Sequence, residues 1–213
     1  MSGRRLSGPY AVTPDWTDTA RLLDVTAALL RGGIALLQYR NKLADPALRR
    51  SQAAALIELA RGHDVPCLIN DDPQLALALQ ADGAHIGRDD GALAEARTLL
   101  GPERIVGVSC YNEASRAAAA HEGGASYLAF GAMFDSPTKP AAVRAPLELV
   151  RQTRALAPEA TICCIGGIQL ANAPLLISAG ADLLAVISDL FEAADPEAQA
   201  RAYARLFSPK APS

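Results

Sequence analysis

Residues 34–70, IALLQYRNKLADPALRRSQAAALIELARGHDVPCLIN, contain two apolar runs separated by a stretch rich in Ala, Leu and Arg. The runs Ile34–Gln38 and Pro66–Asn70 are nearly continuous in apolar residues, which is typical of parallel strands buried on both faces. The stretch between them, Ala47–Arg61, has the spacing of an amphipathic helix. The segment therefore predicts one strand–helix–strand unit of a parallel sheet.

The same unit repeats along the whole chain. Apolar runs of strand-like composition recur at intervals of about 20 to 30 residues, with helical patterns such as Ala92–Leu100 and Leu147–Leu156 between them. The runs are Tyr10–Thr13, Ile34–Gln38, Pro66–Asn70, Gly83–Ile86, Ile105–Ser109, Tyr127–Gly131, Thr161–Ile165 and Leu183–Ile187. Repeated right-handed crossovers close such a sheet on itself, so we predict an α/β fold, the (β/α)8 TIM barrel. The alternative, an open doubly wound sheet, usually has a glycine fingerprint after its first strand, which this chain lacks.

Length and composition favour one domain. Half of the 213 residues are hydrophobic, which is enough for a sizeable core. No linker or low-complexity tract divides the chain. We expect a single barrel over 1–213, with short flexible termini at about 1–8 and 207–213.

Charge and hydropathy restrict the partners. The net charge is −3, whereas nucleic-acid-binding domains usually carry a basic excess, so we expect no nucleic-acid partner. No stretch approaches the roughly 18 apolar residues of a membrane span, and Arg4 and Arg5 precede no signal-peptide-like apolar segment. The cysteines lie beside apolar runs without a C-x-x-C pair, as buried reduced thiols do, and the histidines are too dispersed for a zinc site. These features predict a cytoplasmic protein.

In a barrel of this kind, functional residues lie at the carboxyl ends of the strands. The second run ends in Gln38, Arg40 and Lys42, at alternate positions that point the same way along a strand. An amide, a guanidinium and an ammonium on one side suit phosphate or pyrophosphate. The alternative is a solvated strand end whose charges bind no ligand.

Acidic residues follow the third and fourth runs. Asn70 is followed by Asp71 and Asp72, and the fourth run leads to Asp89 and Asp90. Carboxylates on neighbouring loops could share Mg²⁺, which takes one or two protein carboxylates and completes its shell with water and phosphate. The alternative is that they cap helices. Both roles are compatible if Asp72 caps a helix and Asp71 points inward.

Two further strand ends carry hydroxyls or a lysine. Ser109 ends the fifth run, where a small hydroxyl can bind a phosphate oxygen. The sixth run is followed by Gly131–Pro140, a long loop that contains Ser136, Thr138 and Lys139. This loop could wrap an anion, or it could simply be exposed.

The seventh and eighth runs end in Gly166-Gly167 and Ile187-Ser188. Phosphate often binds between these two loops of a barrel, and paired glycines let the backbone approach it. The chain thus offers a monophosphate site here and a metal-assisted pyrophosphate site elsewhere on the rim. Two phosphorylated substrates that face one another predict a transferase. Because no strand end pairs a nucleophile with a base, we expect departure of a leaving group rather than covalent catalysis.

Seven motifs occur in an order and with spacings that match a known family. They are Q-Y-R-N-K at 38–42, N-D-D at 70–72, A-D-G-A-H-I-G-R-D-D at 81–90, G-V-S at 107–109, G-A-M-F-D-S-P-T-K-P at 131–140, I-G-G-I at 165–168 and A-V-I-S at 185–188. On these motifs the chain resembles the bacterial thiamine-phosphate synthase family.

The resemblance implies an enzyme that joins 4-amino-2-methyl-5-hydroxymethylpyrimidine diphosphate to a carboxylated thiazole phosphate, giving thiamine phosphate, pyrophosphate and CO₂. By motif position it implies Asp71 and Asp90 as ligands of a Mg²⁺ cofactor. The residues implied to bind the pyrimidine diphosphate are Gln38, Arg40, Lys42, Asn70, Ser109 and Lys139. Those implied to be catalytic are Arg40, Lys42, Ser109 and Lys139. Those implied to hold the thiazole phosphate are Ser136, Thr138, Gly167, Ile187 and Ser188.

Some positions depart from the pattern common in the family. Arg88-Asp89 stands where Gln-Glu is common, Tyr111 where His is frequent, and Ala132 and Ala145 where Pro and Gly are frequent. None of these changes removes a proposed contact to metal or diphosphate. Two other functions remain open: a thiazole tautomerase-type isomerase, and a non-catalytic barrel that binds a phosphorylated ligand. A homodimer would fit a barrel of this size.

Overall fold

The computed structural model describes residues 6–88, 92–135 and 143–208. Its parallel strands pair in chain order, and β1 pairs with β8 to close the barrel. The strands are β1 (Gly8–Val12), β2 (Leu36–Tyr39), β3 (Cys67–Asn70), β4 (Gly83–Ile86), β5 (Ile105–Tyr111), β6 (Tyr127–Phe130), β7 (Ile162–Ile165) and β8 (Leu183–Val186). The predicted (β/α)8 barrel is confirmed.

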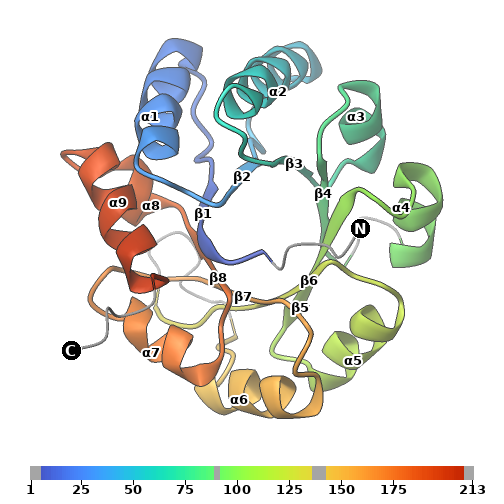
Figure 1. Cartoon of the computed structure of the whole chain (residues 1–213). Coiled ribbons are helices and arrows are strands. Elements are labelled where there is room, and N and C mark those ends of the chain that lie inside the picture. The colour runs from blue at the N-terminus through green and yellow to red at the C-terminus, as the bar shows by residue number, and fades with distance from the viewer. Residues whose placement is uncertain (1–5, 89–91, 136–142, 209–213) are drawn as a thin grey trace.

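Helices follow the strands and form an outer ring around them (Figure 1). In the described part of the chain they are α1 (Thr19–Arg31), α2 (Pro46–Arg61), α3 (Pro73–Ala78), α4 (Leu93–Leu100), α5 (Ala114–Glu122), α6 (Leu147–Leu156), α7 (Ala173–Ala179), α8 (Ser188–Phe191) and α9 (Pro196–Leu206). The last two both follow β8, and α9 packs against α1, which completes the ring. None of these helices is long and apolar enough to cross a membrane.

Local sequence explains where several helices begin. Asp18, Asp45, Asp72 and Asp195 stand directly before α1, α2, α3 and α9, and each side chain accepts a hydrogen bond from a backbone N–H of the first turn. In α2, α3 and α9 the next residue is proline, which lacks the N–H that a first turn leaves unpaired. The expected cap at Asp72 is therefore confirmed.

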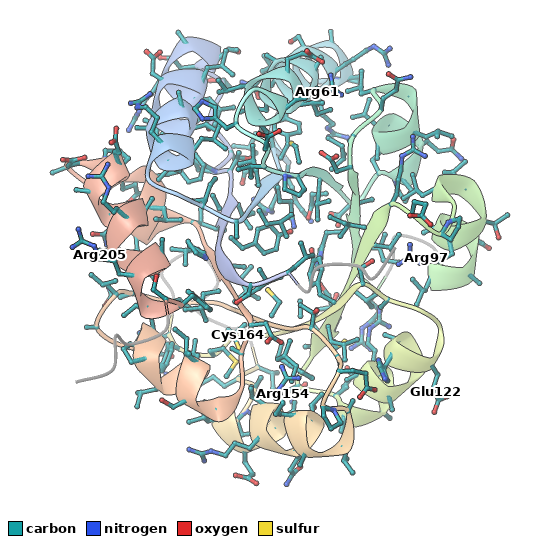
Figure 2. The ribbon with its side chains drawn as sticks, in the orientation of Figure 1. Arg61, Arg97, Glu122, Arg154, Cys164 and Arg205 are labelled. Atoms are coloured by element: carbon teal, nitrogen blue, oxygen red, sulfur yellow. The ribbon has the colours of Figure 1, made fainter. Side chains whose placement is uncertain are left out.

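The strands separate two apolar cores. Tyr10, Leu68 and Tyr127 belong to a cluster of buried side chains inside the barrel. A larger cluster, which includes Cys164, fills the space between strands and helices. Figure 2 shows Cys164 inside the ring of helices, whereas Arg61 projects outward. All four cysteines are buried and free, as predicted. Burial on both faces explains why the strands show no alternating hydrophobic pattern.

One residue at the inner edge of each predicted flexible terminus makes a tertiary contact. Gly8, predicted to belong to a flexible terminus, pairs with Leu183 and begins β1. Phe207, predicted to lie in a flexible tail, ends α9 and packs against the core between strands and helices. Each of these two residues therefore has a tertiary contact that opposes the usual fraying of termini.

Candidate active site

A cavity of about 1500 Å³ opens at the carboxyl ends of the strands, with room for two small ligands. Its wall contains every predicted site residue that the structure describes. These are Gln38, Arg40, Lys42, Asn70, Asp71, Ser109, Gly167, Ile187 and Ser188. The remaining predicted residues, Asp90, Ser136, Thr138 and Lys139, lie outside the described residues. Strand ends far apart in the sequence thus meet at one site.

Successive residues of the segment that begins in β2 divide between the cavity and the helical layer. The three polar residues predicted to share a side do line the cavity. The residues between them face the other way, where the Tyr39 hydroxyl and Asn41 Nδ2 each donate to Gln52 Oε1 of α2 at 3.0 Å. These buried bonds fix the segment and leave its polar heads on the cavity side.

Both cations of this segment are paired with carboxylates. Arg40 Nη1 lies 3.0 and 2.9 Å from the two carboxylate oxygens of Asp15, in the loop after β1. Lys42 Nζ lies 3.2 Å from Asp71 Oδ2, at the end of β3. Two cations and the Asp71 carboxylate therefore line one wall of the cavity, which suits the joint binding of a diphosphate and a divalent cation.

Asp71 stands at a left-handed turn where β3 leaves the barrel. Its φ is +60°, a region that Asp tolerates better than most residues, and its N–H donates to His85 O at 2.8 Å. Its side chain lines the cavity, whereas Asp72 caps α3 through a 2.8 Å bond from Leu75 N. A carboxylate is the donor type that Mg²⁺ prefers. Within the described residues, no group of three His, Cys, Asp or Glu could hold a metal.

A chain of hydrogen bonds crosses the interior of the barrel below the rim. Gln38 Nε2 donates to the hydroxyl of Tyr10, which lies 2.8 Å from the hydroxyl of Tyr127. Tyr127 is hydrogen-bonded to His85 Nδ1 at 2.9 Å, and His85 Nε2 is 2.8 Å from Ser109 Oγ. The chain joins five strands and presents an amide, an imidazole and hydroxyls to the ligand space.

Burial keeps this hydrogen-bonded chain neutral. Desolvation lowers the pKa of His85 to about 4, against a smaller opposing effect of the Asp71 carboxylate. Desolvation also raises the pKa of both Tyr10 and Tyr127 above their ordinary range. Neutral donors and acceptors suit an uncharged polar heterocycle better than phosphate. Ser109, predicted to contact phosphate, belongs to this neutral chain through its bond to His85.

The paired glycines after β7 accommodate a loop as well as a ligand. Their φ angles are +102° at Gly166 and +62° at Gly167. A Cβ on Gly166 would lie 2.7 Å from Ala132 Cα, and one on Gly167 would lie 2.3 Å from Asp135 O. The sequence predicts that these glycines let the backbone approach a ligand. The structure adds a second reason for them, because the segment after β6 crosses directly over both glycines. Both glycines line the cavity together with Ile187 and Ser188, at the end of β8.

Two of the departures from the family pattern lie together on the rim. The Arg88 N–H donates to the Tyr111 hydroxyl at 3.1 Å, and the Arg88 guanidinium lies 5.0 Å from the centre of the Tyr111 ring. The same guanidinium pairs with Glu113. These contacts attach the loop after β4, which leads to Asp90, to the end of β5.

Sequence reasoning missed Asp15 and the neutral chain inside the barrel. No site residue was expected after the first strand, although its end meets the same rim as the others. The sequence pattern gives the histidine at position 85 no role once a zinc site is excluded, and it places the tyrosines at 10 and 127 only in strands. The available signal was a polar group inside a strand that is otherwise buried on both faces.

Comparison with known proteins agrees with this geometry. A family model described as thiamine monophosphate synthase matches residues 9–190. The chain is 55% identical over 206 residues to a thiamine-phosphate synthase of Azoarcus sp. (strain BH72), which covers 97% of this chain and 100% of that protein. The chain belongs to the thiamine-phosphate synthase family.

Solved structures extend the comparison. Thiamine phosphate pyrophosphorylase from Pyrococcus furiosus has a TM-score of 0.83 at 27% identity, covering 95% of this chain and 96% of that chain. A 3-hexulose-6-phosphate synthase with a TM-score of 0.69 and 17% identity, covering 93% of this chain and 99% of that chain, shares the fold alone. Membership of the thiamine-phosphate synthase family, predicted from the seven motifs, is confirmed, and it makes this protein a transferase.

Proposed function

We propose that the enzyme joins a pyrimidine diphosphate to a thiazole phosphate in this cavity, forming thiamine phosphate and pyrophosphate. CO₂ is released as well when the thiazole carries a carboxylate. The observation that best supports this proposal is the meeting of Arg40, Lys42 and Asp71 with the paired glycines of β7 in one cavity. A transferase with two phosphorylated substrates needs both kinds of phosphate site within reach of each other.

The wall formed by β2 and β3 is the proposed diphosphate site. Arg40 presents a guanidinium and Lys42 an ammonium to the cavity, and Asn70 adds an amide from the end of β3. A guanidinium binds phosphate oxygens through paired N–H donors, and an ammonium adds a compact charge. By motif position, Lys139 adds a second ammonium from the loop after β6.

Asp71 is the proposed protein ligand of Mg²⁺, and by motif position Asp90 is the second. When bound there, Mg²⁺ supplies positive charge to the oxygens of the diphosphate. The Asp71 side chain suits this role because it lines the cavity beside Lys42 and is the carboxylate at the end of β3 that does not cap a helix.

The chain of neutral hydrogen-bonded side chains inside the barrel is the proposed binding site of the pyrimidine ring. Gln38 and Ser109 offer donors and acceptors that can read ring nitrogens and an exocyclic amine, and His85 holds the Ser109 hydroxyl through Nε2. The ring amine pushes electrons toward the CH₂–O bond, so pyrophosphate departs first and leaves a stabilised cation. Arg40 and Lys42 neutralise the charge that builds on the leaving group.

The second substrate is proposed to bind through its phosphate at the ends of β7 and β8. Gly167, Ile187 and Ser188 would hold this phosphate, with Ser136 and Thr138 added by motif position. The thiazole nitrogen then attacks the CH₂ of the pyrimidine cation. The barrel wall orients the two rings and limits capture of the cation by water.

The test mixes the purified protein with the pyrimidine diphosphate and the thiazole phosphate, with Mg²⁺ or with EDTA, and follows thiamine phosphate and pyrophosphate. We expect equal amounts of both products, only with Mg²⁺. Formation of an isomerised thiazole without pyrophosphate would favour a tautomerase, and absence of any product would favour a binding role.

Lys139→Ala with nearly full kcat would contradict the role of Lys139. A cytoplasmic location and a homodimer remain predictions, to be checked by fractionation and by light scattering.

A further inference from the structure

Asp15 contacts two residues of the proposed diphosphate site: the guanidinium of Arg40 and the backbone N–H of Lys42. Its carboxylate oxygens lie 3.0 and 2.9 Å from Arg40 Nη1, and Asp15 Oδ1 accepts the backbone N–H of Lys42 at 2.6 Å. The side chain of Arg40 is 16% exposed and that of Asp15 is 29% exposed, so the pair is partly shielded from water. One carboxylate thus contacts both cationic residues that follow β2.

A neighbouring residue of the same loop reinforces this attachment. The hydroxyl of Thr13 donates to Arg40 O at 2.7 Å and accepts the Arg40 N–H at 2.8 Å. The N–H of Thr13 donates to Gln38 O at 2.9 Å, and Thr13 is fully buried. The loop after β1 therefore holds the backbone of Arg40 through Thr13, and it holds the side chain of Arg40 and the backbone of Lys42 through Asp15.

We propose that Asp15 is a positioning residue for the diphosphate site: it holds Arg40 and the Lys42 backbone in the geometry that receives the diphosphate. Asp15 engages only Nη1 of the guanidinium, and among the described residues the Nε and Nη2 atoms of Arg40 have no hydrogen-bond partner. Arg40 is therefore anchored at one nitrogen while its other N–H groups remain for phosphate oxygens in the cavity. The inference rests on the proposed role of Arg40 in diphosphate binding.

Two effects of Asp15 on an anionic ligand oppose one another. An arginine already held in place loses little rotamer freedom when the ligand binds, which strengthens binding. The negative charge of Asp15 repels the diphosphate, which weakens binding. Positioning dominates in this geometry because the Asp15 carboxylate is bonded to Arg40, which lines the cavity, whereas Asp15 is not among the described residues of the cavity wall.

Two substitutions separate these effects. Asp15→Asn removes the charge but keeps an oxygen that can accept from Arg40 and Lys42, whereas Asp15→Ala removes both. Asp18→Ala is the matched control, because Asp18 lies in the same loop and its Oδ1 accepts from Arg21 N at 3.0 Å without touching Arg40. Binding of pyrophosphate with Mg²⁺ is measured by calorimetry, with thermal unfolding of each variant alongside.

We expect Asp15→Ala to weaken pyrophosphate binding by roughly 10-fold, the size of effect that loss of one charge-assisted hydrogen bond produces. Asp15→Asn should stay within about 3-fold of the wild type, and Asp18→Ala should bind as the wild type does. In steady-state assays the KM for the pyrimidine diphosphate should rise in Asp15→Ala, while that for the thiazole phosphate stays unchanged. Tighter or unchanged binding by both Asp15 variants would overturn the proposal.

A double-mutant cycle with Arg40→Ala distinguishes positioning from a general structural role. If Asp15 acts mainly through Arg40, most of the effect of Asp15→Ala disappears in the Arg40→Ala background. Equal effects in both backgrounds would overturn the proposal. If Arg40→Ala itself binds pyrophosphate as the wild type does, the proposed role of Arg40 fails. If Arg40→Ala binds weakly but Asp15→Ala does not, the inference about Asp15 fails alone.

Discussion

Lys42 Nζ lies 3.2 Å from Asp71 Oδ2, so a proposed diphosphate-binding cation is paired with the proposed metal-binding carboxylate. The ammonium and a metal ion would compete for the same oxygen. With a diphosphate present, the ammonium would have another anion to bind and would compete less with the metal for this oxygen. The pair therefore links metal binding to diphosphate binding by simple exchange of partners.

Removing the ammonium should strengthen metal binding in the absence of diphosphate. We expect Lys42→Gln to raise the affinity for Mn²⁺, a paramagnetic substitute for Mg²⁺, by roughly 2- to 5-fold, because exposed ion pairs contribute about that much. The same variant should lose affinity for pyrophosphate. Electron paramagnetic resonance of free Mn²⁺ gives the first value. Arg61→Gln, which removes a positive charge from the outer face of α2, is the control, and an equal gain there would attribute the effect to net charge.

The two adjacent aspartates after β3 should respond very differently to the same change. Asp71→Asn keeps a side chain that tolerates φ of +60° but removes the charge, so we expect kcat to fall by roughly 10²- to 10³-fold and Mn²⁺ binding to be lost. Asp72→Asn keeps a good helix cap and should retain activity. Equal losses in both variants would mean that the metal site is not built on Asp71.

Gly167 should not tolerate a methyl group. In Gly167→Ala the new Cβ would lie 2.3 Å from Asp135 O, so the segment after β6 must move. We expect the KM for the thiazole phosphate to rise by about 10-fold or more, since misplacement of a binding loop by an ångström has effects of that order. Gly124→Ala is the matched control, because its φ of +80° is similarly strained but nothing lies within 4 Å of the new Cβ. Similar KM values in both variants would contradict the prediction.

The pKa of His85 predicts how stability changes in mild acid. In the native state desolvation lowers it to about 4, whereas an unfolded histidine takes up its proton near pH 6.5. Between these values the unfolded state binds more protons, so stability falls as the pH falls from about 6.5 towards 4.

Urea unfolding of the wild type and His85→Gln at pH 7 and pH 5 isolates this contribution. The wild type should lose about 1 to 2 kcal/mol more than the variant over this interval, because one pKa unit corresponds to 1.36 kcal/mol. An equal loss in both proteins would show that His85 is already protonated at pH 5 in the folded state.

The sequence predicted the barrel because each strand is buried on both faces and each helix on one. These two burial patterns differ in length and composition, so they can be recognised in the sequence without any knowledge of contacts. The same logic located Gln38, Arg40 and Lys42 on one side, because alternation along an extended segment is local. The helix cap at Asp72 is local as well, so the sequence could predict that Asp72 caps a helix while Asp71 points into the cavity.

Relations between strands could not be predicted in the same way. Asp15 acquires its role only because β1 pairs with β2, which brings the loop after β1 against Arg40. The bond between Tyr127 and His85 joins residues 42 positions apart. A glycine is needed at position 167 because a Cβ there would collide with the segment after β6. Pattern and propensity describe single elements, and these features belong to pairs of elements.

The opposite orientations of neighbouring residues in the segment that begins in β2 constrain the length of that segment. Tyr39 and Asn41 bind Gln52 on the helix side, while Gln38, Arg40 and Lys42 reach the cavity. Inserting or deleting a single residue between Leu37 and Asn41 would exchange the two sets, burying the cations and exposing the tyrosine to substrate. The length of this segment is therefore constrained by the orientation of its side chains, in addition to any constraint on which residues it contains.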